Sequence, residues 1–281
     1  MRLEKNMKHL KTLMNSAALL TCSVAASTAM AFTADVPDHA HKKAGGFVGL
    51  AVGTQPDYEG SDDHEATVGP FGEYRWESGR YVSVGGTGNA EHAARIEANL
   101  LASKTGWELG PVLQYRLKRD GVDNFQVDNM REVDAATELG AFLGWSGGKF
   151  KLGTTYVADV SDEHDGSIWY FNGDYDIPIN DSFLMNIGAH TAWASDDYME
   201  SYFGVDSRNR GSSTLPDYRA SSGIKDAGLS LLGQYKFNQS WGMLGLISYT
   251  RMLNDAEDSP LVDDEGDKNQ VKGFLAVTYS F

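Results

Sequence analysis

The last residues of the chain alternate between apolar and polar or small side chains. Every second position from Val271 to Phe281 is apolar or glycine, whereas Gln270, Lys272 and Thr278 fall on the other face. A period of two is that of a β-strand whose two faces meet different environments. The segment ends on an aromatic C-terminus, and it resembles the signal by which the barrel-assembly machinery recognises the last strand of an outer-membrane barrel. The last strand of a soluble β-sandwich would also show this pattern, so the test is whether it recurs.

The same period of two recurs along the chain in segments of about ten residues, the length at which a tilted strand crosses a bilayer. Between Trp107 and Lys118, for example, Leu109 and Leu113 share one face and Gln114 lies on the other. We count about twelve such segments, and bacterial membrane barrels have an even number of strands. The sequence therefore predicts an all-β fold, a transmembrane antiparallel up-and-down β-barrel over residues 44–281. The strands are expected to start near Ala44, Glu65, Gly79, His92, Gly106, Asp134, Gly148, Gly166, Asp181, Lys225, Ser240 and Asn269.

The connections between these segments alternate between short and long. Short turns such as Glu77–Gly79 and Asn238–Ser240 are expected in the periplasm, and long loops are expected on the outside of the cell. Both chain termini then lie in the periplasm, as an even number of strands requires. The four longest outer loops are expected at residues 55–64, 119–133, 195–224 and 253–268.

Aromatic residues support this orientation. Trp107, Trp241 and Tyr81 fall next to short turns, whereas Trp169 and Trp193 fall towards the long loops. Two interfacial belts of aromatic rings are typical of membrane barrels, because amphipathic rings favour the depth of the lipid headgroups. A soluble sandwich has no reason to sort its aromatic residues in this way, so the barrel is the better interpretation.

The first 31 residues have the features of a secretory signal peptide. Basic residues precede an apolar stretch, and the small-residue site Ala29-Met30-Ala31 predicts cleavage after Ala31. A membrane anchor is the alternative, but the apolar stretch is shorter than a spanning helix needs. Cleavage before Cys22, as in a lipoprotein, is disfavoured by Thr21. Residues 32–43 are then expected to form a flexible periplasmic tail, and the mature chain would contain no cysteine and no disulfide.

The chain carries a formal net charge of −15, and the acidic residues are concentrated in the expected outer loops. This balance argues against nucleic acid as a partner. A solvated rim that resists aggregation is the simpler interpretation of the acidic loops. The alternative is loosely bound Ca²⁺ or Mg²⁺, which prefers clustered carboxylates and would bridge the rim to lipopolysaccharide phosphates in the surrounding outer-membrane lipid. No loop has EF-hand spacing, and the weak metal candidates are Asp57, Glu59, Asp62, Asp63, Asp255 and Asp258.

Three stretches resemble the MltA-interacting protein (MipA)/OmpV family of outer-membrane proteins. They are residues 56–62 (PDYEGSD), 223–226 (GIKD) and 255–262 (DAEDSPLV), in matching order and spacing. The resemblance implies an outer-membrane barrel, and for one member a scaffold that joins a murein hydrolase to a peptidoglycan synthase. The family has no catalytic residues, so none are carried over, and we interpret the motif residues as structural. They are Tyr58, Gly60, Ser61, Gly223, Lys225, Asp226, Asp255, Ala256, Asp258, Ser259 and Pro260.

Three functions follow as hypotheses. The first is a non-enzymatic scaffold that links peptidoglycan machinery to the outer membrane; a surface adhesin, like the channel that follows, is an alternative to it. The second is a small channel, although charges of both signs inside the barrel favour a plug over a selective pore. The third, a barrel enzyme that uses His64 or His164 beside acidic residues, is disfavoured because no catalytic motif is present, and no cofactor is expected. The predicted lumen charges are Arg116, Glu138, Lys151, Asp174, Asp176 and Lys236.

Overall fold

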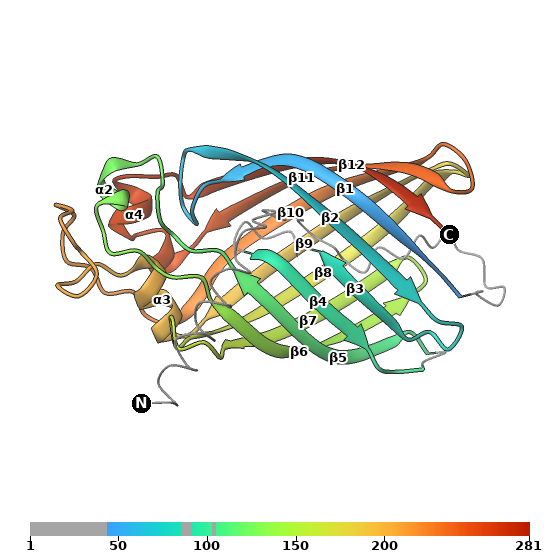
Figure 1. Cartoon of the computed structure of the whole chain (residues 1–281), viewed down its shortest axis with the longest axis horizontal. Helices are drawn as coiled ribbons and strands as arrows, with labels where there is room; N and C mark the ends of the chain where they lie inside the picture. Colours follow the sequence, from blue (N-terminus) through green and yellow to red (C-terminus); the bar gives the residue numbers. More distant parts are fainter. Residues whose placement is uncertain (1–43, 86–91, 103–104) are drawn as a thin grey trace, which may run out of the picture.

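The alternating C-terminal segment forms strand β12 (Asn269–Ser280), which pairs with the first strand, β1 (Gly45–Pro56). The computed structural model describes residues 44–85, 92–102 and 105–281. In these ranges twelve antiparallel strands pair with their sequence neighbours, and the β1–β12 pair closes the sheet into a barrel (Figure 1). Closure leaves no unpaired sheet edge in the lipid. The predicted up-and-down barrel is confirmed.

The remaining strands start within three residues of their predicted positions. The predicted signal peptide (1–31) and periplasmic tail (32–43) lie outside the described residues, as does part of the predicted turn at 103–105. The strands between β1 and β12 are β2 (His64–Arg75), β3 (Tyr81–Gly85), β4 (His92–Asn99), β5 (Trp107–Arg116), β6 (Thr137–Gly147), β7 (Phe150–Asp159), β8 (Ser167–Asn180), β9 (Phe183–Ala194), β10 (Gly223–Lys236) and β11 (Trp241–Met252).

Side chains on each strand alternate between the outer wall and the interior of the barrel. On β12, Val271, Leu275 and Val277 are 47–59% exposed, whereas Lys272 and Thr278 are buried. The same alternation on neighbouring strands gives an apolar outer wall around an interior of polar and small side chains, in which large apolar side chains such as Phe47, Phe71 and Phe274 are also buried. An apolar wall of this extent would drive association in water, so its environment is the hydrocarbon of a membrane.

Aromatic rings lie on the outer wall near both ends of the barrel. Trp107 and Trp241 are exposed beside short turns, and Trp169 and Trp193 are exposed towards the long connections. The assignment of Tyr81 to the first belt was wrong, because this ring is only 1% exposed and points inward. The alternation of side chains along β3 explains the error. The apolar residues at the second and fourth positions of the strand face outward, so the ring of Tyr81 at the first position faces the interior.

The two ends of the barrel differ. Short turns and the C-terminus lie at one end, whereas the helices of the described ranges gather at the other (Figure 1). These are α2 (Phe125–Asp128), α3 (Asp196–Phe203) and α4 (Pro260–Asp263), and a 3₁₀ turn, η1 (Asn254–Ala256), accompanies them. No helix in the described ranges has the length and apolar character needed to cross a bilayer.

Candidate functional site

The long connections fold over the end of the barrel and form a structure with its own core, which we call the outer cap. It comprises the β1–β2, β5–β6, β9–β10 and β11–β12 connections with their helices. Tyr198 and Phe203 of α3 and Leu261 of α4 are completely buried. In α3 the buried positions recur at the spacing of one helix face, and Asp196 and Asp197 occupy the first turn, where negative charge is favourable. The loops therefore fold over this end of the barrel around a packed core of their own.

A buried ion pair lies beneath the outer cap. Arg116 of β5 binds both carboxylate oxygens of Glu138 on β6, with Nε–Oε1 2.8 Å and Nη2–Oε2 3.3 Å. Both side chains are 1% exposed. A buried guanidinium needs its remaining donors satisfied, and Arg116 donates to the hydroxyls of Tyr198 (2.9 Å) and Tyr170 (3.3 Å). The pair thus links the barrel wall to helix α3.

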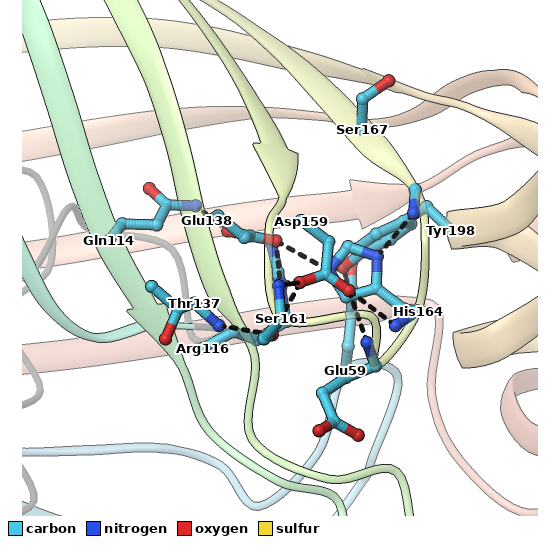
Figure 2. A network of polar contacts seen from close by, with 12 residues as sticks. Glu59, Gln114, Arg116, Thr137, Glu138, Asp159, Ser161, His164, Ser167 and Tyr198 are labelled. Carbon is cyan, nitrogen blue, oxygen red and sulfur yellow. Dashed lines mark hydrogen bonds and ion pairs between the residues drawn. The ribbon is translucent and has the colours of Figure 1, made fainter.

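His164 completes this cluster (Figure 2). Its Nδ1 accepts a hydrogen bond from the Gly166 amide (3.1 Å), so Nε2 carries the proton and donates to Glu138 Oε1 (3.0 Å). The turn that holds His164 is organised by the carboxylate of Asp159, which accepts hydrogen bonds from the amides of Ser161 and His164 at 2.8 and 2.7 Å. Both ring nitrogens of His164 are therefore occupied by structural contacts.

A second buried cluster joins the first outer loop to β10. Lys225 is completely buried and pairs with Glu59 and with Asp226, the latter at 2.7 Å. The other oxygen of Glu59 accepts a hydrogen bond from the Tyr198 hydroxyl at 2.7 Å. That hydroxyl also accepts a hydrogen bond from Arg116. Tyr198 therefore connects the two charged clusters through one oxygen atom.

A local irregularity in β10 makes this arrangement possible. Adjacent strand residues normally face opposite sides, yet Lys225 and Asp226 are both buried inside the barrel. The register shifts between Ile224 and Asp226, as in a β-bulge, and Ile224 remains on the outer wall at 49% exposure. A bulge adds one residue to a strand and re-aims the side chains beside it. The predicted motif residues thus enter the lumen together.

The other motif residues hold the cap loops against one another. The Tyr58 hydroxyl donates to the carbonyls of Leu261 and Glu265, each at 3.2 Å. Burial, and then the neighbouring Asp57, raise the pKa of Tyr58. Ser259 is the N-cap of α4 and donates its hydroxyl to the Phe203 carbonyl at 2.6 Å. This stretch of the motif thus forms a 3₁₀ turn followed by a capped helix.

The remaining motif residues have steric or turn-forming roles. Gly60 has a positive φ of 103°, and a side chain there would overlap Val262. Asp255 accepts a hydrogen bond from the Ser221 amide (2.8 Å), and Ala256 is buried. Ser61 is buried and accepts a hydrogen bond from the Asp63 amide. Pro260 begins α4 and Gly223 begins β10. Asp258 is exposed.

The acidic metal candidates do not converge on one point. Glu59 faces Lys225 inside the barrel, Asp57 accepts a hydrogen bond from the Asp123 amide (2.9 Å), and Asp255 binds the Ser221 amide. Asp62 and Asp63 are exposed. Among the residues that the structure describes, no three acidic, histidine or cysteine side chains are arranged to hold a metal ion.

The predicted lumen charges fall into two groups. Arg116 and Glu138 belong to the buried cluster under the cap, whereas the other four lie nearer the end with the short turns. There Lys151 pairs with Asp176 at 3.0 Å, and Asn186 donates to the same carboxylate at 2.8 Å. Asp174 is buried, and Lys236 lines a small hollow at the rim.

Several residues of the cap were not singled out from the sequence. No sequence motif marks three tyrosines that lie around the buried Arg116, namely Tyr170, Tyr198 and Tyr202. The sequence analysis considered His164 only beside its acidic neighbours in the chain. Arg119 is 6% exposed, its guanidinium donates a hydrogen bond to the Tyr202 carbonyl (2.9 Å), and burial lowers its pKa. The sequence shows these residues only as polar residues in or beside the expected loops. That position does not tell whether such a side chain is buried in a cluster or exposed to solvent.

A closed barrel with a lipid-facing wall, aromatic rings near both ends and a cap on one end defines an outer-membrane β-barrel protein. Residues 48–281 match the family model described as MltA-interacting protein MipA, and the chain belongs to this family. The protein is therefore located in the outer membrane. Because the long loops of such barrels lie outside the cell, we assign the capped end to the exterior.

Parts of this chain are similar in sequence to known relatives, and its fold is similar to that of solved structures. The MltA-interacting proteins of Escherichia coli (strain K12) and Shigella flexneri are each 30% identical over 112 residues, which are 40% of this chain and 44% of theirs. The match thus spans less than half the length of these relatives. The NanC porin (TM-score 0.46, 12% identity) covers 83% of this chain and 98% of its own. An outer-membrane channel from Pseudomonas putida F1 (TM-score 0.45, 10% identity) covers 88% and 100%.

Proposed function

We propose that this protein is a non-conducting, non-enzymatic anchor that holds a murein enzyme at its periplasmic rim. The observation that carries the non-conducting part of the proposal is the outer cap, whose core and polar clusters are buried at one end of the barrel. Helix α3 and the buried Lys225–Glu59 pair lie at this end, and we expect them to obstruct the entry of a solute. Separating a buried, hydrogen-bonded ion pair is strongly unfavourable, which argues against a permanently open pore.

The periplasmic rim is the face that remains for a cell-wall partner. The two curated relatives bear the name MltA-interacting protein, and the resemblance to their family implies contact with a murein hydrolase and a peptidoglycan synthase. In this chain the rim consists of short turns and a small hollow with apolar and polar lining. The hollow is formed by Pro178, Asn180–Leu184, Gln234 and Lys236.

The absence of catalysis is part of the proposal. A histidine that acts as a general base needs a ring nitrogen directed at a nucleophile or at water. Both nitrogens of His164 are held by Glu138 and by the Gly166 amide. His190 contacts the hydroxyl of Thr250 (2.9 Å) in the wall, and His64 contacts the Val271 carbonyl (3.0 Å). These contacts favour structural roles.

Planar-bilayer recording tests the closed state. Refolded protein should insert without ohmic conductance steps. A variant without most of the β9–β10 connection (residues 196–221 replaced by a short Gly/Ser linker) removes α3 and should conduct. Stable steps from the unmodified protein would contradict the proposal.

Site-specific crosslinking in intact cells tests the anchoring role. A photoreactive residue placed at Glu77, Asp181 or Gln239, all exposed in periplasmic turns, should yield adducts with a murein hydrolase or synthase. The same residue placed at Asp62 or Asp264, exposed on the outer cap, is the matched control and should yield none. Failure of every rim position to capture a murein enzyme, in membranes where the protein is correctly folded, would reject the anchoring role.

A further inference from the structure

Two cations share one carboxylate at the outer rim of the barrel. Arg251 Nη2 lies 2.7 Å from Glu257 Oε1, and Lys268 Nζ lies 2.8 Å from the same oxygen. The hydrogen bond from Lys268 and the charge of Arg251 lower the pKa of Glu257, so the carboxylate is ionised. These three residues, which we call the rim triad, therefore carry a net positive charge in a strongly acidic protein.

Arg251 stands at the depth of the outer lipid headgroups. It shares the outward face of β11 with Trp241, Ile247 and Tyr249. Trp241 lies beside a periplasmic turn and marks the inner interface. Ten residues of strand, at roughly 3.3 Å each and tilted by roughly 40°, rise roughly 25 Å, the height of the apolar band of a membrane barrel. Arg251 therefore lies where the hydrocarbon ends.

The rim triad is held in place but has donors to spare. Asn269 Oδ1 accepts hydrogen bonds from the hydroxyl of Tyr249 (2.7 Å) and from Arg251 Nη1 (3.3 Å). These contacts and Glu257 use two of the five N–H groups of the guanidinium. The side chains of Arg251 and Lys268 are 40% and 37% exposed. The nearby Asp267 accepts hydrogen bonds from the backbone and side-chain N–H groups of Asn269.

We propose that Arg251 and Lys268 bind a phosphate group of a phosphorylated glycolipid in the outer leaflet. A phosphate has the negative charge and the acceptor oxygens that suit these positively charged donors, and arginine binds phosphate through paired N–H groups. The position of the site identifies the lipid as the source, because acyl chains would pack below it against Ile247 and Val271, which are 62% and 47% exposed. A free phosphate has no acyl chains, so packing against this apolar wall would not add to its affinity. The proposal does not depend on the anchoring role.

Native mass spectrometry of the refolded full chain in detergent, titrated with bisphosphorylated lipid A, tests the site. The R251Q/K268Q variant should bind roughly 10- to 30-fold more weakly, since each basic group near a membrane surface contributes roughly a factor of five. The variant R251K/K268R retains both charges and should bind within a few-fold of the unmodified protein. Heat-modifiable mobility on electrophoresis establishes that each variant is folded.

The outer cap offers a matched control. Arg208 and Arg219 also share one carboxylate, Glu200, at 3.3 and 3.5 Å, but they lie in the β9–β10 connection away from the wall. R208Q/R219Q should bind lipid A as the unmodified protein does. Equal binding by R251Q/K268Q, or equal binding of lipid A without phosphate, would overturn the proposal. Inorganic phosphate that competes at concentrations equal to those of lipid A would identify a free-phosphate site instead and would also overturn it.

Discussion

At the scale of single residues, the outer cap depends on a few buried polar atoms. The Tyr198 hydroxyl lies between Arg116 and Glu59, and so connects a pair on the wall with a pair that includes a loop residue. The charges were visible in the sequence, and Arg116 and Glu138 were predicted to face the lumen. Their partners were not predictable, because Glu59 and Lys225 are 166 positions apart in the chain.

Substitution of Lys225 by methionine should destabilise the protein. It removes the cation that pairs with the buried carboxylates of Glu59 and Asp226, and the loss of one partner of a buried pair costs about 3–5 kcal/mol. Urea unfolding in micelles, followed by tryptophan fluorescence, measures the change. Lys118→Met is the control, because Lys118 is 52% exposed in its pair with Asp120 and should leave the midpoint unchanged. Equal midpoints for the two variants would contradict the role of the buried pair.

The outer cap should loosen as the pH rises above 10.0, the ordinary pKa of tyrosine. Because burial and Asp57 raise the pKa of Tyr58, folding favours its neutral hydroxyl. This contribution to stability is complete below pH 10 and is lost as rising pH ionises the side chain. Near-ultraviolet circular dichroism during an alkaline titration measures the loss. In Tyr58→Phe the alkaline decrease should be shallower, and an identical titration would refute the assignment.

At the scale of elements, the strands are predictable and the cap helices are not. The period of two extends over enough residues to locate all the strands. The helices have only four or eight residues, too few for a 3.6-residue pattern to be recognised. They exist because tertiary contacts bury one face of each. The bulge in β10 likewise left no signal, because Ile224-Lys225-Asp226 shows no interruption such as a glycine.

Substitution of Ser259 by alanine should weaken the contact between α3 and α4. It removes the N-cap of α4 and leaves the buried Phe203 carbonyl without its donor, at a combined cost of about 1–3 kcal/mol. Protease cleavage in the β11–β12 connection should become faster, whereas Ser207→Ala, at an exposed position, should have no effect. Cleavage at the unmodified rate in Ser259→Ala would show that the cap does not rely on this serine.

At the scale of the whole molecule, the apolar wall determines where the barrel sits. Tryptophans near its two ends should lie at the two headgroup regions. Bromine attached near the headgroup end of the acyl chains should therefore quench tryptophan fluorescence more strongly than bromine near the chain ends. A control with the six tryptophans reduced to Trp107 and Trp241 reports the periplasmic interface alone. Stronger quenching from the bilayer centre would contradict this placement.

The amino-acid sequence by itself determined the barrel, its strand number and which side chains face the lipid. These properties follow from local alternation, since every second residue of a strand faces the same side and only an apolar set is stable against hydrocarbon. The tertiary structure alone decided that the outer end is capped and how its charges pair. Those features depend on which distant loops meet. The buried ion pairs join residues that are far apart in the chain, and they form only where the barrel brings the loops together.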